Sequence, residues 1–256
     1  MIMGDLLANK TILVMGVANR RSIAWGCAQV MQEQGANLIY TYQNERLKKG
    51  LLKLTGDEAS LLECDVADDN SIAQAFSEIK TRYGKIDGIV HAIAYAPKAE
   101  LEGEITNATR AGFQTALDVS AYSLIAVSKV AMELELLNDP ASLVTLTYMG
   151  STRAIPSYNT MGIAKAALES SVRYLARDLG KFGVRVNAIS AGAIKTLAVT
   201  GIKGHSDLLE ISKQRTVDQE AVTIREVGGT CAFLMSDLAT GVVGDVIYVD
   251  KGVHLI

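Results

Sequence analysis

The segment YNTMGIAK places a phenol, Tyr158, and an ammonium, Lys165, seven residues apart among good helix formers. On an α-helix seven residues make two turns, so the two side chains share one face about 10 Å apart along the axis. A phenol there can donate a hydrogen bond to an oxygen that gains negative charge, and an ammonium can bind ligand hydroxyls. The pair predicts a ligand site, although an aromatic at a helix start and a solvated lysine would need no ligand.

The sequence around this pair alternates short β-branched runs with longer amphipathic stretches, which predicts alternating strands and helices. The expected strands are 11–17, 37–42, 60–66, 87–94, 142–148, 184–190 and 246–250, and the expected helices are 22–35, 69–83, 110–137, 158–181 and 225–236. Residues 195–225 are polar and follow no clear period. This order is typical of an α/β fold with a doubly wound parallel sheet of the Rossmann-like kind. No repeat or linker divides the chain, so we expect a single domain over 1–256.

Composition limits the classes of function. The chain has 256 residues, of which 49% are hydrophobic, and a net charge of -3, so it can bury a large core and is a poor nucleic-acid binder by bulk charge. Its cysteines, Cys27, Cys64 and Cys231, are far apart and form no CxxC motif, so we expect buried thiols in a reducing compartment and no metal site. No secretory signal and no apolar run of about 18–20 residues is present, which predicts a soluble cytoplasmic protein without a membrane partner.

The first strand–helix connection, GVANRRSIAWG, is a candidate phosphate-binding turn. Ligands of such sheets bind at the carboxyl ends of the strands, where a helix N-terminus can hold a pyrophosphate. Gly16 and the helix start at Ser22 and Ile23 are therefore candidate cofactor contacts. The usual glycine spacing is missing, so a turn in which Ser22 is only the helix N-cap is an equal alternative.

Polar residues at the next strand ends agree with a dinucleotide site. Gln43 follows the second strand, where an adenosine ribose would lie, and Asp65 with Val66 ends the third strand, where a carboxylate and an amide could hold adenine. Residues 91–94, from His91 to Ala94, end the fourth strand. Each has a structural alternative, because Asp65 could cap the next helix and His91 could be a hydrogen-bonded, half-buried histidine.

The whole pattern resembles the short-chain dehydrogenase/reductase superfamily and, within it, the bacterial enoyl-acyl-carrier-protein reductases of type II fatty acid synthesis. The resemblance covers nearly the whole chain and rests on GVANRRSIAWG, YTYQNERLK, CDVADDNSI, HAIAYAP, YNTMGIAKAALE, RVNAISAGAIKTLA and SDLATGVVGDVIYVD. Most of the superfamily has a YxxxK pattern. The enoyl reductase branch has six residues between tyrosine and lysine and a second tyrosine upstream, as Tyr148, Tyr158 and Lys165 do here.

The resemblance implies a role for each motif residue. Lys165 is expected to bind the nicotinamide ribose, Tyr158 to face the acyl thioester carbonyl, and Tyr148 to line the pocket near that carbonyl. The implied cofactor contacts are Gly16, Ser22, Ile23, Gln43, Asp65, Val66, Ile93, Lys165, Ile194, Lys195, Thr196, Leu197 and Ala198. Ala96, Met161 and Ile202 are implied to line the acyl channel, with Ala198 beside them. Residues 195–215 correspond to a substrate loop.

The resemblance also implies the cofactor, the partner and the assembly. We expect NADH rather than NADPH, because Gln43 and Asn44 follow the second strand where a 2′-phosphate usually needs a basic residue; Arg20 and Arg21 leave the point open. The implied substrate is an enoyl group on acyl carrier protein, which is acidic, so Lys203 and Lys213 are candidate docking cations. A homotetramer that packs helices 110–137 and 157–181 across subunits is also implied.

The chain departs from the family pattern at several loops. Ala193 and Lys195 stand where proline and arginine are usual, TVDQE replaces a Thr-Pro pair, and Lys251 stands where glycine is usual. These departures motivate one alternative, a diverged dinucleotide-binding paralogue with weak or no turnover. A separate alternative is a carbonyl-reducing short-chain dehydrogenase. That class would normally have YxxxK with an upstream serine, so Tyr148 near that place argues against it.

Overall fold

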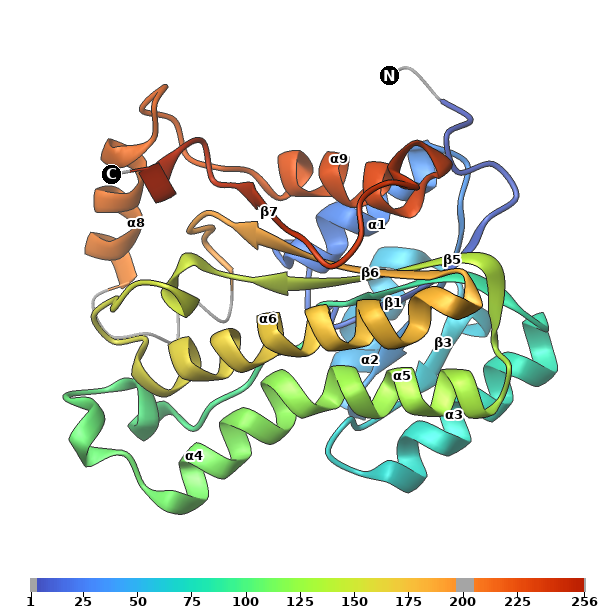
Figure 1. Ribbon diagram of the computed structural model, residues 1–256, viewed down its shortest axis with the longest axis horizontal. Coiled ribbons are helices and arrows are strands. Elements are labelled where there is room, and N and C mark those ends of the chain that lie inside the picture. The colour runs from blue at the N-terminus through green and yellow to red at the C-terminus, as the bar shows by residue number, and fades with distance from the viewer. Residues whose placement is uncertain (1–3, 197–204, 256) are drawn as a thin grey trace.

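The structure is a computed structural model that describes residues 4–196 and 205–255 (Figure 1). Within these residues seven parallel strands form one sheet in the order β3-β2-β1-β4-β5-β6-β7. The strands are β1 Thr11–Met15, β2 Asn37–Tyr42, β3 Leu61–Glu63, β4 Ile86–His91, β5 Leu137–Thr147, β6 Val184–Ala191 and β7 Val246–Val249. The Rossmann-like α/β fold expected from the sequence is confirmed.

Helices cover both faces of the sheet, as parallel strands require. The helices are α1 Ile23–Glu33, α2 Glu45–Thr55, α3 Asp69–Tyr83, α4 Arg110–Leu117, α5 Ser123–Glu133, α6 Asn159–Leu179, α8 His205–Arg215 and α9 Ile224–Met235. In Figure 1, α1 and α9 lie above the sheet and α3 to α6 lie below it. Each layer has its own buried apolar cluster, and the sheet separates the two.

The order of the strands determines where a ligand can bind. The chain runs outward from β1 to β2 and β3 and then returns to β4 on the other side of β1. The connections after β1 and β4 therefore diverge at the carboxyl ends of these two strands, and this divergence opens a crevice. In Figure 1 the strand arrowheads point toward the left, where the start of α6 and helix α8 also lie.

Close packing of two glycines fixes α1, which begins at this crevice. A Cβ on Gly26 of α1 would lie 2.3 Å from the carbonyl oxygen of Ile224, and one on Gly228 of α9 would lie 2.5 Å from the carbonyl oxygen of Gly26. The two backbones therefore touch, and larger residues at either position would push α1 away from α9. This contact sets the direction in which the N-terminus of α1 points.

Several elements differ from the sequence prediction. Helices α2 and α8 were not predicted, although α8 occupies part of the region expected to be irregular. The helix expected over 110–137 is interrupted by a π-helical turn at Asp118–Tyr122. It ends at Glu133, and β5 begins at Leu137. Strand β4 ends at His91, so residues 92–94, predicted to be strand, leave the sheet.

The segment Arg110–Glu133 is long and apolar enough, by length and composition alone, to cross a membrane. Half of its most apolar window is buried inside the structure. Ala116 on α4 and Leu124, Val127 and Ala131 on α5 are fully buried, and the three α5 residues belong to the core below the sheet. Such burial is typical of a core helix, and its apolar composition follows from this packing.

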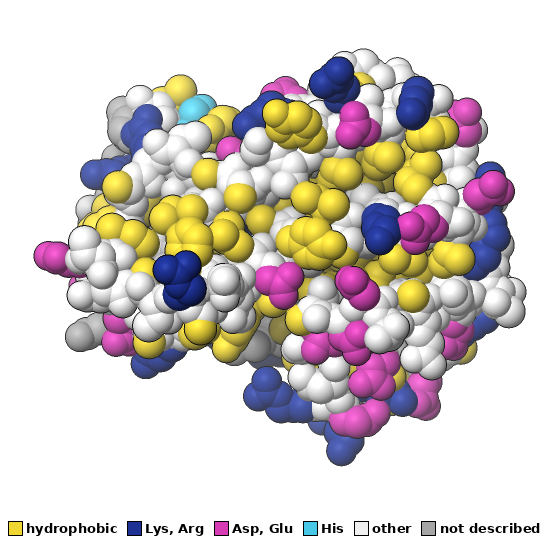
Figure 2. Space-filling model, turned by 60° about the horizontal axis from the view of Figure 1, so that its bottom comes forward, with side chains coloured by type: hydrophobic (Ala, Val, Ile, Leu, Met, Phe, Trp, Pro, Cys, Tyr) yellow, Lys and Arg dark blue, Asp and Glu magenta, His cyan; other side chains and the backbone are white. Residues whose placement is uncertain are grey.

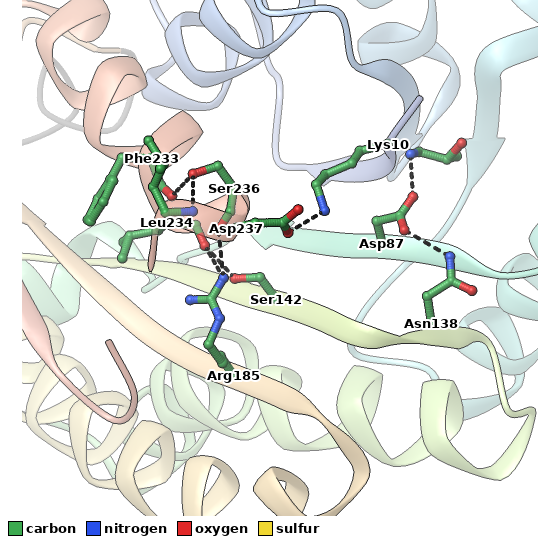
Figure 3. A network of polar contacts seen from close by, with 11 residues as sticks. Lys10, Asp87, Asn138, Ser142, Arg185, Phe233, Leu234, Ser236 and Asp237 are labelled. Atoms are coloured by element: carbon green, nitrogen blue, oxygen red, sulfur yellow. Dashed lines mark hydrogen bonds and ion pairs between the residues drawn. The ribbon is translucent and has the colours of Figure 1, made fainter. Parts of the chain in front are cut away.

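A polar network at the amino ends of the strands joins the sheet to α9 (Figure 3). The Asp87 carboxylate accepts from the Thr11 N–H at 2.7 Å and from the Asn138 amide at 2.8 Å, which links β1, β4 and β5. Arg185 of β6 donates to the carbonyl oxygen of Leu234 at the end of α9, at 2.7 Å. The network lies at the end of the sheet opposite the crevice, so we assign it a structural role.

Candidate active site

A central cavity of about 360 Å³ opens at the carboxyl ends of β1, β4, β5 and β6. It is lined by Gly16, Ala18, Ser22, Ile23, Ala24, Ala92, Ile93, Ala94, Tyr95, Ala96, Leu101, Leu146, Thr147, Tyr148, Tyr158, Met161, Lys165, Ala191, Gly192, Ala193, Ile194 and Thr196. Eleven residues singled out from the sequence therefore meet in one cavity: Gly16, Ser22, Ile23, Ile93, Ala96, Tyr148, Tyr158, Met161, Lys165, Ile194 and Thr196. They come from five separate segments of the chain.

Two tyrosines form an aromatic pair in this cavity. Tyr158 is the N-cap residue of α6, and Tyr148 directly follows β5. Their ring centroids are 5.1 Å apart and the ring planes meet at 74°, an edge-to-face contact that aromatic quadrupoles favour. Gly150 makes room for the pair, since a Cβ there would lie 2.5 Å from Cδ1 of Tyr158.

Both phenols are neutral donors over the ordinary pH range. Burial, with a smaller contribution from Tyr148, raises the pKa of Tyr158 well above its usual value of 10. Burial also raises the pKa of Tyr148, and the Asp250 carboxylate adds to this while Arg215 opposes it. A neutral phenol can donate a hydrogen bond to an oxygen that develops negative charge, so either ring can serve as an oxyanion donor.

Lys165 lies in the middle of α6 and is 95% buried, with a relative exposure of 5%. Its Nζ donates to the carbonyl oxygen of Leu146 at 2.7 Å, which directs the ammonium toward the end of β5. Burial lowers the pKa of Lys165 from 10.5 to about 8, although the charge of Glu169 partly opposes the shift. An ammonium has three N–H donors, so two remain for a ligand in the cavity.

The first turn has the features of a phosphate cradle. Gly16 has φ +96°, and a Cβ there would lie 2.1 Å from the carbonyl oxygen of Ala92, so only glycine fits. Ser22 is the N-cap of α1, but its hydroxyl accepts from the N–H groups of Ala18 and Asn19, both at 3.0 Å, and not from the helix. The serine therefore shapes the turn and leaves the first N–H groups of α1 available to an anion.

A second space, here called the side cavity, adjoins the first and has a volume of about 530 Å³. It shares Gly16, Ala18, Ala92, Ile93, Ala94 and Tyr95 with the central cavity and adds Val17, Thr41, Tyr42, Gln43, Leu47, Cys64, Asp65, Val66 and Val119. The Gln43 amide donates to the Asp65 carboxylate at 3.1 Å, which joins the ends of β2 and β3. Asp65 also accepts from the Ala67 N–H, and Asp68, not Asp65, caps α3.

His91 is a satisfied core histidine and does not line either cavity. Its Nδ1 contacts the Thr145 hydroxyl at 3.0 Å and its Nε2 contacts the Ser123 hydroxyl at 2.8 Å. Burial, followed by the positive charge of Lys165, lowers the pKa of His91 to about 3, so the ring is neutral. The structural alternative stated for this residue is confirmed, except that the ring is fully buried and not half-buried.

A third space, here called the basic cavity, has a volume of about 550 Å³. Its lining residues are Arg20, Arg21, Ala193, Ile194, Lys195, Leu209, Glu210, Ser212, Lys213, Thr216, Ala221, Val222 and Ile224. Lys195 and Lys213 therefore face a space that also holds two arginines of the first turn. Lys195 does not line the central cavity. Leu197, Ala198, Ile202 and Lys203 lie outside the described residues.

Some lining residues were not predicted from the sequence. Tyr95 lines both the central and the side cavity, and Leu101 lines the central cavity. The motif HAIAYAP contains Tyr95, so its position after a buried strand was an available signal. Ser120 binds the backbone of Tyr95 from the π-helical turn, and no sequence signal marked this contact.

A family model described as "Enoyl-(Acyl carrier protein) reductase" matches residues 16–254. The chain belongs to this enoyl reductase family. Its sequence is 61% identical over 249 residues to the "Enoyl-[acyl-carrier-protein] reductase [NADH] FabI" of Enterococcus faecalis, an alignment that covers 97% of this chain and 99% of that protein. The resemblance stated from the sequence motifs is confirmed.

Solved structures of the enoyl reductase family have the same fold. The enoyl-acyl carrier protein reductase of Bacillus cereus, crystallised with NADP+ and an indole naphthyridinone, matches with a TM-score of 0.95 and 45% identity, covering 98% of this chain and 99% of that one. The Anaplasma phagocytophilum enoyl reductase, crystallised with NAD, matches with a TM-score of 0.94 and 38% identity, covering 99% and 97%. Both structures hold a dinucleotide.

Proposed function

We propose that this enoyl reductase reduces the trans-2 double bond of an enoyl thioester on acyl carrier protein with NADH, in type II fatty acid biosynthesis. The observation that carries the proposal is the meeting of Tyr148, Tyr158 and Lys165 in one cavity at the carboxyl ends of the strands. The name of the Enterococcus faecalis relative states the same activity and cofactor. We propose that the whole chain forms a single domain for cofactor and substrate.

The residues of the crevice fit a dinucleotide. The Gly16 backbone approach and the free N–H groups at the start of α1 suit a pyrophosphate. Ile93, Ile194 and Thr196 line the central cavity, where they suit the nicotinamide end. Val66, Asp65 and Gln43 line the side cavity and suit the adenosine end. When bound, NADH supplies the hydride for the reduction.

Tyr158 is proposed as the donor to the thioester oxygen. Hydride addition at the β-carbon leaves an enolate, so negative charge develops on that oxygen until the α-carbon takes a proton from solvent. The neutral Tyr158 phenol can stabilise this charge with a hydrogen bond. Tyr148 packs against the ring of Tyr158 and lines the same pocket. We assign Tyr148 the lesser role of holding that ring in place. Ala96 and Met161 supply small and apolar lining for the acyl chain, and Ile202 is proposed beside them.

Lys165 is proposed to orient the cofactor through its ribose. Its bond to the Leu146 carbonyl holds the ammonium at the end of β5 and leaves two N–H donors. Because Tyr158 and Lys165 belong to the same stretch of α6 and its cap, one rigid helix positions substrate and cofactor together. Such orientation before reaction lowers its entropic cost.

The end of β2 favours NADH over NADPH. Asn44 caps α2 by accepting from the Leu47 N–H, and Lys48 is paired with Glu58 at 2.8 Å. Gln43 is bonded to the Asp65 carboxylate, whose negative charge would repel a 2′-phosphate. The charge of Lys48 is thus balanced by Glu58. The Asp65 carboxylate lies near the end of β2, where a 2′-phosphate would need a positive charge. Arg46 remains as an exposed cation on α2.

The basic cavity is proposed as the approach for the acidic carrier. Arg20, Arg21, Lys195 and Lys213 line it together with a single carboxylate, Glu210. None of the four cations has a carboxylate partner within 4.0 Å among residues 4–196 and 205–255. Complementary charge speeds encounter more than it tightens binding.

We propose that Leu197 and Ala198 contact the cofactor and that 195–215 is the substrate loop.

We propose a homotetramer in the cytoplasm. Figure 2 shows hydrophobic side chains gathered on the face below the sheet. Exposed large residues on this layer include Tyr122 at the end of the π-helical turn and Ile125 three residues later on α5, and Ile163 and Tyr174, eleven apart on α6. Each pair shares a helix face, as an interface would require. The three cysteines are buried and unpaired, which suits a reducing compartment.

A spectrophotometric assay with NADH and crotonyl thioester tests the proposal. The expected result is steady NADH oxidation with the enoyl thioester, slower oxidation of NADPH, and none with a panel of ketones. Oxidation with ketones but not with the thioester would favour the carbonyl-reducing alternative. NADH binding without oxidation by any enoyl thioester would favour a dinucleotide-binding protein without turnover.

A further inference from the structure

A π-helical turn, Asp118–Tyr122, interrupts the long helix that α4 and α5 would otherwise form. The Ser123 N–H bonds back to the carbonyl oxygen of Asp118, five residues earlier, instead of four as in an α-helix. The extra residue rotates the helix and changes which side chains face the sheet. Ser120 within the turn and Ser123 after it are both fully buried.

Ser120 binds the backbone of Tyr95 twice. Its hydroxyl accepts from the Tyr95 N–H at 2.9 Å and donates to the Tyr95 carbonyl oxygen at 2.9 Å. Tyr95 is a loop residue with 54% relative exposure, and within residues 4–196 and 205–255 its N–H donates to no backbone carbonyl. One buried hydroxyl thus replaces both bonds that a neighbouring strand would have supplied.

Ser123 binds the other end of the same segment. Its hydroxyl contacts Nε2 of His91 at 2.8 Å and donates to the carbonyl oxygen of Val119 at 2.7 Å. The neutral His91 ring also contacts the Thr145 hydroxyl, so both of its nitrogens have partners. His91 is the last residue of β4, and Tyr95 follows four residues later.

We propose that the π-helical turn is a positioning element for the ligand crevice, with Ser120 and Ser123 as positioning residues. Between their two attachment points lie Ala92, Ile93 and Ala94, and these three residues, with Tyr95, line both the central and the side cavity. The segment therefore forms a wall shared by the two cavities. Holding it at both ends fixes the cavities relative to each other.

A purely structural role for these serines predicts a different outcome from a positioning role. Buried serines often bond to their own helix, as Ser128 of α5 does when it donates to the carbonyl oxygen of Leu124 at 2.7 Å. Ser128 is 1% exposed and is therefore a matched control. Ser120 differs because its two bonds leave the helix and reach a segment that lines the crevice. The inference rests on the proposed function for the identity of the ligands.

The experiment compares the full-length Ser120→Ala, Ser123→Ala and Ser128→Ala variants. NADH affinity is measured by fluorescence titration, thermal stability by circular dichroism, and KM and kcat with crotonyl thioester. For Ser120→Ala we expect the Kd for NADH to rise about 3- to 30-fold, with a larger change in KM than in kcat, because two hydrogen bonds to Tyr95 are lost. We expect a smaller rise for Ser123→Ala and wild-type affinity for Ser128→Ala.

Amide hydrogen exchange of segment 92–96 in the ligand-free wild-type protein gives a second readout that needs no turnover. In the wild type the Tyr95 amide is expected to exchange slowly, although the Tyr95 residue is exposed. In Ser120→Ala the same amide is expected to exchange quickly. A folded Ser120→Ala with wild-type NADH affinity, or a Tyr95 amide that is unprotected in the wild type, would overturn the inference. If the wild type fails to bind NADH, the proposed function is wrong. Slow exchange of the Tyr95 amide would in that case still support the hydrogen bonds from Ser120 to the Tyr95 backbone.

Discussion

The edge of one tyrosine ring meets the face of the other where Tyr148 and Tyr158 pack, with centroids 5.1 Å apart and planes at 74°. Tyr158 therefore has a neighbour that restricts its ring before any ligand binds. An edge-to-face pair contributes about 0.5–1.5 kcal/mol beyond the area it buries. The contact explains why a second tyrosine lies ten residues upstream of the proposed donor.

Two substitutions at Tyr148 separate its ring from its hydroxyl. Tyr148→Phe keeps the aromatic contact, so we expect kcat with crotonyl thioester to fall by no more than about threefold. Tyr148→Ala removes the contact and frees Tyr158 to rotate, so we expect a fall of about tenfold. Steady-state kinetics of both variants measures this. A larger loss in Tyr148→Phe than in Tyr148→Ala would make the Tyr148 hydroxyl, not its ring, the important group.

The buried Lys165 predicts a pH dependence of cofactor binding. Because burial lowers its pKa to about 8, the ligand-free protein loses the ammonium as pH rises through that value. If the ammonium binds the ribose, the Kd for NADH should rise above pH 8, by at most about tenfold per pH unit for one proton. Fluorescence titration from pH 7 to 10 measures the slope, and Lys165→Met should bind weakly with no slope. An equal slope in both proteins would assign the proton to another group.

A rise in pH that weakens NADH binding through Lys165 should increase the contribution of Lys165 to stability. The unfolded chain keeps the lysine proton up to its ordinary pKa of 10.5, whereas the folded chain releases it near 8. Between these values the unfolded state binds more protons, so the contribution of Lys165 to the free energy of unfolding rises with pH. The stability advantage of Lys165→Met over the wild type should therefore be largest below pH 8 and shrink toward pH 10.5.

Cofactor preference should respond to the end of β2. Gln43→Arg places a guanidinium beside Asp65 and near the expected 2′-phosphate position, so we expect the ratio of NADPH to NADH in kcat/KM to rise about tenfold or more. Gln43→Leu removes the bond to Asp65 without adding charge and serves as the control. An unchanged ratio in Gln43→Arg would place the adenosine ribose elsewhere.

Two departures from the family pattern contact each other. Lys251 Nζ lies 2.8 Å from the carboxylate of Asp218 and 3.4 Å from that of Glu226, and Asp218 belongs to TVDQE. Lys251 also has φ +53°, a left-handed conformation that favours glycine. The ion pairs compensate for this conformation and join the loop after α8 to the start of α9.

Lys251→Met and Lys251→Gly separate the charge from the backbone conformation. The Met variant loses the ion pairs and keeps the left-handed residue, so we expect its Tm to fall by about 1–3 °C, whereas the Gly variant should fall less. Thermal unfolding at low and high salt measures the Tm of both variants. High salt should reduce the difference in Tm between the wild type and Lys251→Met. A wild-type Tm in the Met variant at low salt would show that these pairs contribute nothing.

The sequence predicted the parts of the site that depend on short, regular patterns. The two-turn spacing of Tyr158 and Lys165 brought both to one cavity because Tyr158 is the N-cap of α6 and Lys165 lies on that uninterrupted helix. Gln43 and Asp65 met because β2 and β3 are parallel neighbours. Each of these predictions used only the period of an element and the rule that parallel strands end at one edge.

The parts that the sequence did not predict depend on contacts between distant segments. The π-helical turn lies in a stretch whose apolar residues fit one long helix, so only packing against Tyr95 and His91 reveals it. Helix α8 has a weakly amphipathic sequence, which hides it from a search by period. Ser22 was correctly predicted at a helix start, but the N–H groups that it binds lie upstream of the helix.

The most direct test of the account is turnover and cofactor binding in Tyr158→Phe. The change removes one hydroxyl and keeps the ring, so NADH should bind with wild-type Kd. Loss of one oxyanion donor costs up to about 10²–10³-fold, and water can partly replace a phenol, so we predict a fall in kcat with crotonyl thioester of about 10- to 100-fold. Wild-type kcat in a folded Tyr158→Phe that binds NADH normally would contradict the account.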